Sequence, residues 1–155
     1  MEAVCRGKQW DVALAYNKEG RIIGALPYLI GTKLGMRFVL QPQLTPFGGP
    51  WFRYDTLEPE QQEQPLARLQ FEQEVYTQLY DAIDALHLSV YLQRFAPQIA
   101  NWHPLYTRGY HQTTRYTYRI EDISQPDSVF ASFTSKRRQQ LRKWQDHYTF
   151  QTTTN

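Results

Sequence analysis

Two strand patterns joined by a polar turn constrain the fold of this 155-residue chain more than any other feature. Residues 10–16 alternate between apolar and polar side chains, and a second, more apolar segment covers residues 21–30. Between them, residues 17–20 have the sequence Asn-Lys-Glu-Gly. A polar turn that ends in glycine between two such segments is typical of a β-hairpin. We therefore expect an antiparallel strand pair near the start of the chain.

A single long helix is predicted in the middle of the chain. Apolar side chains recur there every three or four residues and would form one stripe along a helix. The stripe consists of Phe71, Val75, Leu79, Ile83 and Leu86. Before it, residues 38–40 predict a third strand, and prolines and glycines break regular structure between residues 42 and 50. The polar, acidic residues 55–65 are interpreted as a loop.

Two more strands and a short helix are expected after the long helix. Residues 90–95 predict a strand, and residues 101–108 predict a short helix that Asn101 can cap and Gly109 can end. Residues 110–121 alternate regularly and predict a long strand.

A dense basic cluster begins the last predicted helix, which Thr134 can cap. Five cations and one acid stand between Thr134 and His147, although the formal net charge of the whole chain is only +2. The cations are Lys136, Arg137, Arg138, Arg142 and Lys143. Because a helix N-terminus presents unpaired N–H groups, this placement suits a bound phosphate or another anion. A solvated surface helix is the alternative interpretation.

Composition excludes several classes of protein. Hydrophobic residues make up 41% and aromatic residues 15%, which indicates a globular rather than a disordered chain. No apolar run approaches the roughly 20 residues of a membrane span. A lone cysteine, Cys5, cannot form an internal disulfide and favours a reducing compartment such as the cytoplasm. The histidines lack metal-ligand spacing and no nucleophile motif is present, so we expect no metal and assign no catalytic residue.

The segment around the basic cluster carries a family resemblance. Phe130 and Phe133 are followed at residues 135–143 by Ser-Lys-Arg-Arg-Gln-Gln-Leu-Arg-Lys. This order resembles the junction between the two halves of FemAB-type aminoacyltransferases, GNAT-superfamily enzymes that build peptide bridges on bacterial peptidoglycan precursors. Residues 19–27 are similar to the central hairpin of GNAT folds. Residues 45–51 resemble a glycine-containing loop of the family that precedes a wall of the substrate cleft.

A second GNAT motif is nearly matched but is rejected. Arg21, Gly24 and Leu26 have the spacing of the loop that cradles the CoA pyrophosphate, yet Leu26 stands where that motif has Gly or Ala. The segment also has the pattern of a strand rather than of a loop that enters a helix. We instead expect Gly24 to pack beneath a neighbouring strand.

The resemblance implies a fold and a division of the chain. A GNAT half-domain has this order of elements, so the implied fold is α+β, with a mixed, mostly antiparallel sheet flanked by helices. Residues 1–122 would form a GNAT-like lobe that lacks its first helices. Residues 123–155 would begin a second lobe with the basic helix, and the chain would be part of an enzyme about twice as long.

The resemblance also implies an activity. The enzyme would be an N-acyltransferase that transfers an acyl or aminoacyl group to a small-molecule or nucleotide-linked amine, and this half would shape the acceptor cleft. Acyl-CoA or aminoacyl-tRNA would be the donor, held mainly by the missing lobe, and no cofactor is assigned to this half. Contact with tRNA through that lobe and a homodimer are further expectations.

Five residues are expected to bind the substrate. Arg138 matches the arginine of the junction motif and would contact a phosphate of a nucleotide-linked acceptor. Lys136 and Arg142 would support it, because Arg142 lies one helical turn beyond Arg138 on the same face. Tyr116 and Tyr118 would line the cleft.

The alternative function is a non-catalytic binding module. Its basic and aromatic residues would hold an anionic ligand or single-stranded nucleic acid. A high aromatic content also suits a protein partner.

Overall fold

The computed structural model describes residues 9–145 and 147–149. The chain forms two compact units, which divide between Gln112 and Thr113. The division that we predicted after residue 122 falls within the second unit. In the described part of the chain, no helix is both long and apolar enough to cross a membrane.

The first unit begins with the predicted hairpin. Strand β1 (Trp10–Tyr16) pairs antiparallel with strand β2 (Ile22–Lys33). Asn17 closes the turn, because its side-chain Oδ1 accepts hydrogen bonds from two backbone N–H groups of the turn, at 3.1 and 2.9 Å. Gly20 adopts a φ of +76°, which glycine reaches without strain. The local turn sequence therefore accounts for the hairpin.

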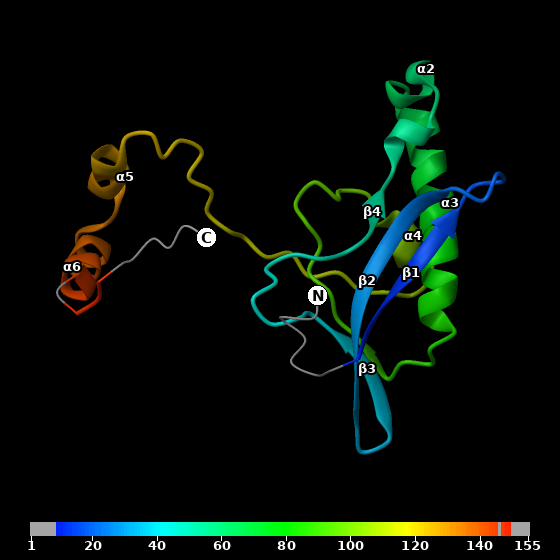
Figure 1. Ribbon diagram of the computed structural model, residues 1–155, viewed down its shortest axis with the longest axis horizontal. Coiled ribbons are helices and arrows are strands. Elements are labelled where there is room, and N and C mark those ends of the chain that lie inside the picture. The colour runs from blue at the N-terminus through cyan, green and yellow to red at the C-terminus, as the bar shows by residue number, and fades with distance from the viewer. Residues whose placement is uncertain (1–8, 146, 150–155) are drawn as a thin grey trace. The chain divides into compact units, whose positions relative to one another are not determined.

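Strand β2 lies at the centre of a five-stranded sheet (Figure 1). Its second edge is shared by β3 (Met36–Leu40) and β4 (Trp51–Phe52), both antiparallel to β2. Strand β5 (Val90–Tyr91) adds to β3 in parallel orientation. This mixed, mostly antiparallel sheet with its helices confirms the predicted α+β class.

Helix α3 (Pro65–Asp84) covers one face of the sheet and confirms the predicted apolar stripe from Phe71 to Ile83, whereas Leu86 lies beyond the end of the helix. Val75 and Leu79 are fully buried, and Tyr76 and Tyr80 extend the buried face. Gly24 lies beneath this helix: a Cβ atom there would collide with the Val75 side chain. The close neighbour of Gly24 is thus mainly the helix and not, as we predicted, a strand.

Two predicted boundaries differ from the structure. The segment interpreted as a loop contains a 3-10 helix, η1 (Tyr54–Thr56), and a short helix, α2 (Pro59–Gln62), which a reciprocal capping box of Glu58 and Gln61 stabilises. The strand predicted at residues 90–95 is reduced to β5. Phe95 at its far end forms an isolated parallel bridge with Gly48.

A short helix, α4 (His103–Tyr106), follows near its predicted position. The Asn101 side chain accepts the His103 N–H at 3.3 Å, and Gly109 has a φ of +84° where the chain leaves this helix. The helix is shorter than predicted: Trp102 is its N-cap residue, Thr107 is its C-cap residue, and Asn101 lies just before the cap.

The predicted long strand at residues 110–121 is wrong. These residues have no regular secondary structure, and no strand in the described ranges pairs with them. A segment with alternating side chains forms a strand only where a sheet edge pairs with its backbone or where one of its faces packs against a core. Tyr116 and Tyr118 are 95% and 101% exposed, so neither condition is met here.

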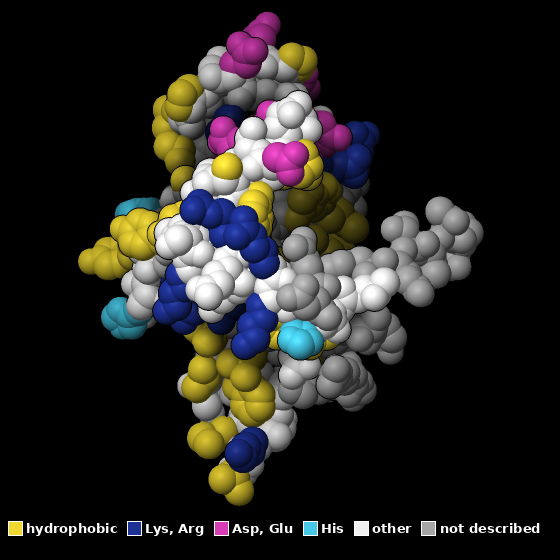
Figure 2. Space-filling model, turned by 90° about the vertical axis from the view of Figure 1, so that its left-hand side faces the viewer, with side chains coloured by type: hydrophobic (Ala, Val, Ile, Leu, Met, Phe, Trp, Pro, Cys, Tyr) yellow, Lys and Arg dark blue, Asp and Glu magenta, His cyan; other side chains and the backbone are white. Residues whose placement is uncertain are grey.

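The second unit contains helices α5 (Pro126–Ser132) and α6 (Ser135–Gln145). Thr134 caps α6 as predicted, since its carbonyl and its hydroxyl oxygen accept the first N–H groups of the helix. Residues 113–155 contain seven Lys or Arg and four Asp or Glu. Figure 2 shows Lys and Arg side chains gathered together with few acids among them. The net positive charge of the chain thus comes from this unit.

Candidate functional site

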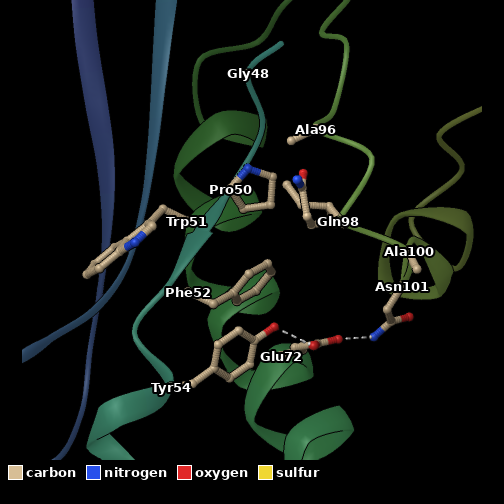
Figure 3. Close-up of a pocket in the computed structure, with 11 residues that line it drawn as sticks. Gly48, Pro50, Trp51, Phe52, Tyr54, Glu72, Ala96, Gln98, Ala100 and Asn101 are labelled. Carbon is tan, nitrogen blue, oxygen red and sulfur yellow. Dashed lines mark hydrogen bonds between the residues drawn. The ribbon is translucent and has the colours of Figure 1, made fainter. Parts of the chain in front are cut away.

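A cavity of about 280 Å³ opens in the first unit between two loops and helix α3 (Figure 3). One wall comes from the residues around β4, and the other comes from the loop that leads to α4. The lining residues are Gly48, Pro50, Trp51, Phe52, Tyr54, Glu72, Ala96, Gln98, Ile99, Ala100 and Asn101. The Phe52 and Tyr54 rings turn toward the cavity, whereas the Trp51 indole points away from it.

Backbone hydrogen bonds join the two walls at one end of the cavity. The Gly48 N–H donates to the Arg94 carbonyl at 2.6 Å, and the Ala96 N–H donates to the Gly48 carbonyl at 3.2 Å. Gln41 braces the same place, because its side-chain oxygen accepts the Arg94 N–H and its amide donates to the Thr45 carbonyl. These bonds define the separation of the walls.

Gly49 allows the closest approach of the two walls. Its φ is +95°, and a Cβ atom there would lie 2.7 Å from Phe95 Cδ1. Both the backbone angle and the space therefore require glycine. The loop at residues 45–51, which resembles a family loop that precedes a cleft wall, supplies this glycine and lines the cavity with Gly48, Pro50 and Trp51.

The polar centre of the cavity is the Glu72 carboxylate. The Tyr54 hydroxyl donates to its Oε1 at 2.6 Å, and the Asn101 amide donates to its Oε2 at 2.8 Å (Figure 3). Asn101 is held in turn, since its backbone carbonyl accepts the Tyr76 hydroxyl at 2.8 Å. Three segments that are far apart in the sequence thus converge on one half-buried carboxylate.

Tyr54 remains a hydrogen-bond donor at neutral pH. Burial raises its pKa to about 12, and the hydrogen bond to the Glu72 carboxylate adds to this effect. The Arg68 guanidinium lies over the Tyr54 ring, 4.6 Å from the ring centre, which is a cation–π distance. The phenol is therefore fixed both through its hydroxyl and through its ring.

This arrangement suits a small cationic ligand. A carboxylate has about four lone-pair sites, so Glu72 can accept further hydrogen bonds beyond those from Tyr54 and Asn101. The Phe52 and Tyr54 rings provide apolar and π surface beside the charge. Within the described residues, no three His, Cys, Asp or Glu side chains are placed to hold a metal ion.

The five residues predicted to bind substrate all lie in the second unit, and none lines this cavity. Tyr116 and Tyr118 stand on the irregular segment, and Lys136 is exposed in the first turn of α6. Arg138 and Arg142 contact helix α5 and the residue that follows it. The Arg138 guanidinium donates to the Ala131 and Phe133 carbonyls, and the Arg142 guanidinium lies 5.6 Å from the centre of the Phe130 ring.

The residues at the centre of the cavity were not predicted from the sequence. Asn101 was predicted only as a helix cap, and Tyr54 and Glu72 were not singled out as functional. One signal was present: Glu72 follows Phe71 and lies one turn before Tyr76, so it borders the apolar stripe of the helix. A carboxylate in such a position is a candidate for a partly buried, hydrogen-bonded site.

No known protein family, curated protein or solved structure matches this chain. The resemblance to FemAB-type enzymes therefore rests on the sequence motifs alone.

Proposed function

We propose that this chain forms the acceptor-binding part of an N-acyltransferase, which transfers an acyl or aminoacyl group to an amine. The observation that carries the proposal is the Glu72 carboxylate, oriented by Tyr54 and Asn101 inside a cavity. A carboxylate binds an ammonium group through charge-assisted hydrogen bonds, which are stronger than neutral ones. The junction motif at residues 135–143 supports the same class of enzyme by resemblance.

The proposed reaction is acyl transfer to nitrogen. The amine nitrogen attacks the carbonyl carbon of an acyl-CoA thioester or an aminoacyl-tRNA ester, so that a C–N bond forms and the C–S or C–O bond breaks. The bound ammonium group first releases one proton to water, so that the nitrogen attacks as a neutral amine. The second proton that this nitrogen loses is taken up by the leaving thiolate or alkoxide. Glu72 serves to bind and orient the acceptor, and such positioning lowers the entropic barrier to attack.

The same proposal extends to location and partners. A cytoplasmic location is proposed because the single cysteine, Cys5, favours a reducing compartment. The donor, contact with tRNA through a further lobe, and a homodimer belong to this proposal as well.

An NMR titration of the whole chain tests the acceptor site. We expect n-butylamine, which is cationic at neutral pH, to shift the amide signals of residues 48–54 and 96–101. The neutral isostere n-butanol should not do so. Glu72→Gln should weaken amine binding by about tenfold or more, because the ammonium group loses the opposite charge of its hydrogen-bond acceptor.

Glu74→Gln is the matched control, since Glu74 is an exposed glutamate on the same helix outside the cavity lining. It should leave amine binding unchanged. Equal binding of amine and alcohol, or equal binding by the wild-type chain and Glu72→Gln, would contradict the proposed acceptor site. Mass spectrometry of amides formed from either donor class would test the transfer step itself.

A further inference from the structure

The second unit presents an exposed surface of cations and rings that the cavity does not use. It consists of Lys136, Arg137, Lys143, Trp144 and Tyr148 and is called the basic–aromatic surface below. All five side chains are exposed, with Trp144 at 58% and Tyr148 at 57%. Neighbouring aromatic side chains that are exposed to solvent often mark an interaction site.

The structure separates the cations of α6 into two groups. Arg138 and Arg142 are committed to helix α5, through carbonyl hydrogen bonds and a ring contact. Within the described part of the chain, the side chains of Lys136, Arg137 and Lys143 form no hydrogen bond or ion pair. Three of the five cations in the cluster thus remain available for a ligand.

Helix geometry places the available groups in two neighbouring rows. Lys136 and Lys143 are seven residues apart, which is about two turns and therefore one face. Arg137 and Trp144 have the same spacing, and Tyr148 follows the end of α6. The Trp144 and Tyr148 rings stack with their centres 5.2 Å apart and their planes at 28°. The result is a group of cations beside a stacked pair of rings, whose outer faces form an aromatic platform.

The irregular segment of the same unit repeats this composition. Arg115 and Arg119 flank Tyr116 and Tyr118, and all four side chains are exposed. An extended stretch of alternating cations and tyrosines has no apolar face to bury in a core. It offers further phosphate and base contacts instead.

We propose that the basic–aromatic surface binds single-stranded nucleic acid. Lys136, Arg137 and Lys143 contact phosphates, while Trp144 and Tyr148 stack on unpaired bases. A polyanion complements the surplus of cations, and only a ligand with accessible flat rings uses the aromatic platform as well. Bases in a duplex are already stacked and do not offer these faces.

An anionic membrane surface fits the same cations less well. A helix that lies in the lipid interface needs a broad apolar face. Helix α6 has only two large apolar residues, Leu141 and Trp144, and Leu141 is already half-buried. The distribution of side chains therefore favours nucleic acid over lipid.

Fluorescence anisotropy with a labelled 15-nucleotide oligo(U) RNA tests the proposal on the whole chain. The variant Lys136→Glu/Arg137→Glu/Lys143→Glu should weaken binding at least tenfold at low salt. Its slope of log K against log salt should be shallower by about two, because each lost phosphate contact on a single strand removes about 0.7. The control Lys18→Glu/Arg21→Glu/Lys33→Glu makes the same charge change at exposed positions of the first unit and should change binding less than threefold.

A second variant isolates the stacking contribution. Trp144→Ala should weaken binding by about tenfold without changing the salt slope, since loss of one stacked base removes no phosphate contact. Tyr106→Ala, which removes an exposed ring from helix α4, should have no effect. Circular dichroism on each variant establishes that its helices remain formed.

Three results would overturn the proposal. The first is absence of any anisotropy change at 50 mM salt. The second is equal weakening by both triple variants, which would indicate attraction by net charge alone. The third is displacement of the RNA by phosphatidylglycerol vesicles or by duplex of equal charge more readily than by unlabelled oligo(U).

Discussion

At Gly24, the side chain of Val75 from helix α3 occupies the space that a Cβ atom would need. The Trp51 carbonyl oxygen would lie 3.3 Å from the same atom, so the backbone of β4 restricts the position as well. Gly20 differs, because its need for glycine comes from a φ of +76° in a turn that the local sequence already predicts. One glycine is required by its neighbours in sequence, and the other by contacts across the fold.

Gly24→Ala should therefore destabilise the chain by about 1–3 kcal/mol, the usual cost of an added carbon in a tightly packed interior. Urea unfolding measures this change in the free energy of unfolding. In a Val75→Ala background the same substitution should cost clearly less, because the colliding methyl group is gone. Additive effects of the two substitutions would show that helix α3 does not cause the strain.

The hydrogen-bond partners of Glu72 could not be predicted from its own position in the sequence. Its position beside the apolar stripe was visible in the sequence, but its two donors, Tyr54 and Asn101, come from segments on either side of the helix. No local pattern connects these three residues. The candidate site therefore emerged only when the loops were folded around helix α3.

Among the elements, helix α3 was the most predictable. Its apolar side chains recur every three or four residues over several turns. The buried residues Phe71, Val75, Leu79 and Ile83 coincide with the predicted stripe. Such a long pattern specifies both the helix and the face that it buries. The structure adds the tyrosines that widen this face.

A matched pair of substitutions tests the importance of the buried face. Leu79 is fully buried and Leu66 is 67% exposed on the same helix. Leu79→Ala should lower the free energy of unfolding by about 2–5 kcal/mol, as large-to-small changes in cores do. Leu66→Ala should lower it by less than about 0.5 kcal/mol. Similar losses at both positions, measured by urea unfolding, would contradict the assigned orientation of the helix.

The segment at residues 110–121 shows why strands are harder to predict than helices. A helix satisfies its own backbone hydrogen bonds, whereas a strand requires a partner that the local sequence does not contain. The residues around Tyr116 and Tyr118 do alternate, but no strand in the described part of the chain pairs with them. The aromatic and basic side chains of the segment are exposed instead.

For the molecule as a whole, the division into two units separates the cavity from the basic–aromatic surface. Every buried core residue in the described part of the chain lies between Ala13 and Leu105, and Tyr110 packs against this cluster. The first unit thus contains its own hydrophobic core. The second unit has two helices joined by Arg138 and Arg142.

A chain that ends at Gln112 should therefore retain a cooperative thermal transition, followed by circular dichroism at 222 nm. It should also keep the n-butylamine-dependent NMR shifts while losing affinity for oligo(U). Loss of cooperative unfolding in the shortened chain would show that residues 113–155 are needed to form the core. Retention of full oligo(U) affinity would place nucleic-acid binding outside the second unit.

The sequence by itself determined the hairpin, the long amphipathic helix and the capped basic helix, because each depends on turn chemistry or on a repeated local period. Only the tertiary structure decided that Gly24 lies beneath Val75, that Glu72 meets Tyr54 and Asn101, and that residues 110–121 remain outside the sheet. Those features depend on contacts between segments far apart in the chain. Their energies come from shared space and from hydrogen-bond partners, neither of which exists before the chain folds.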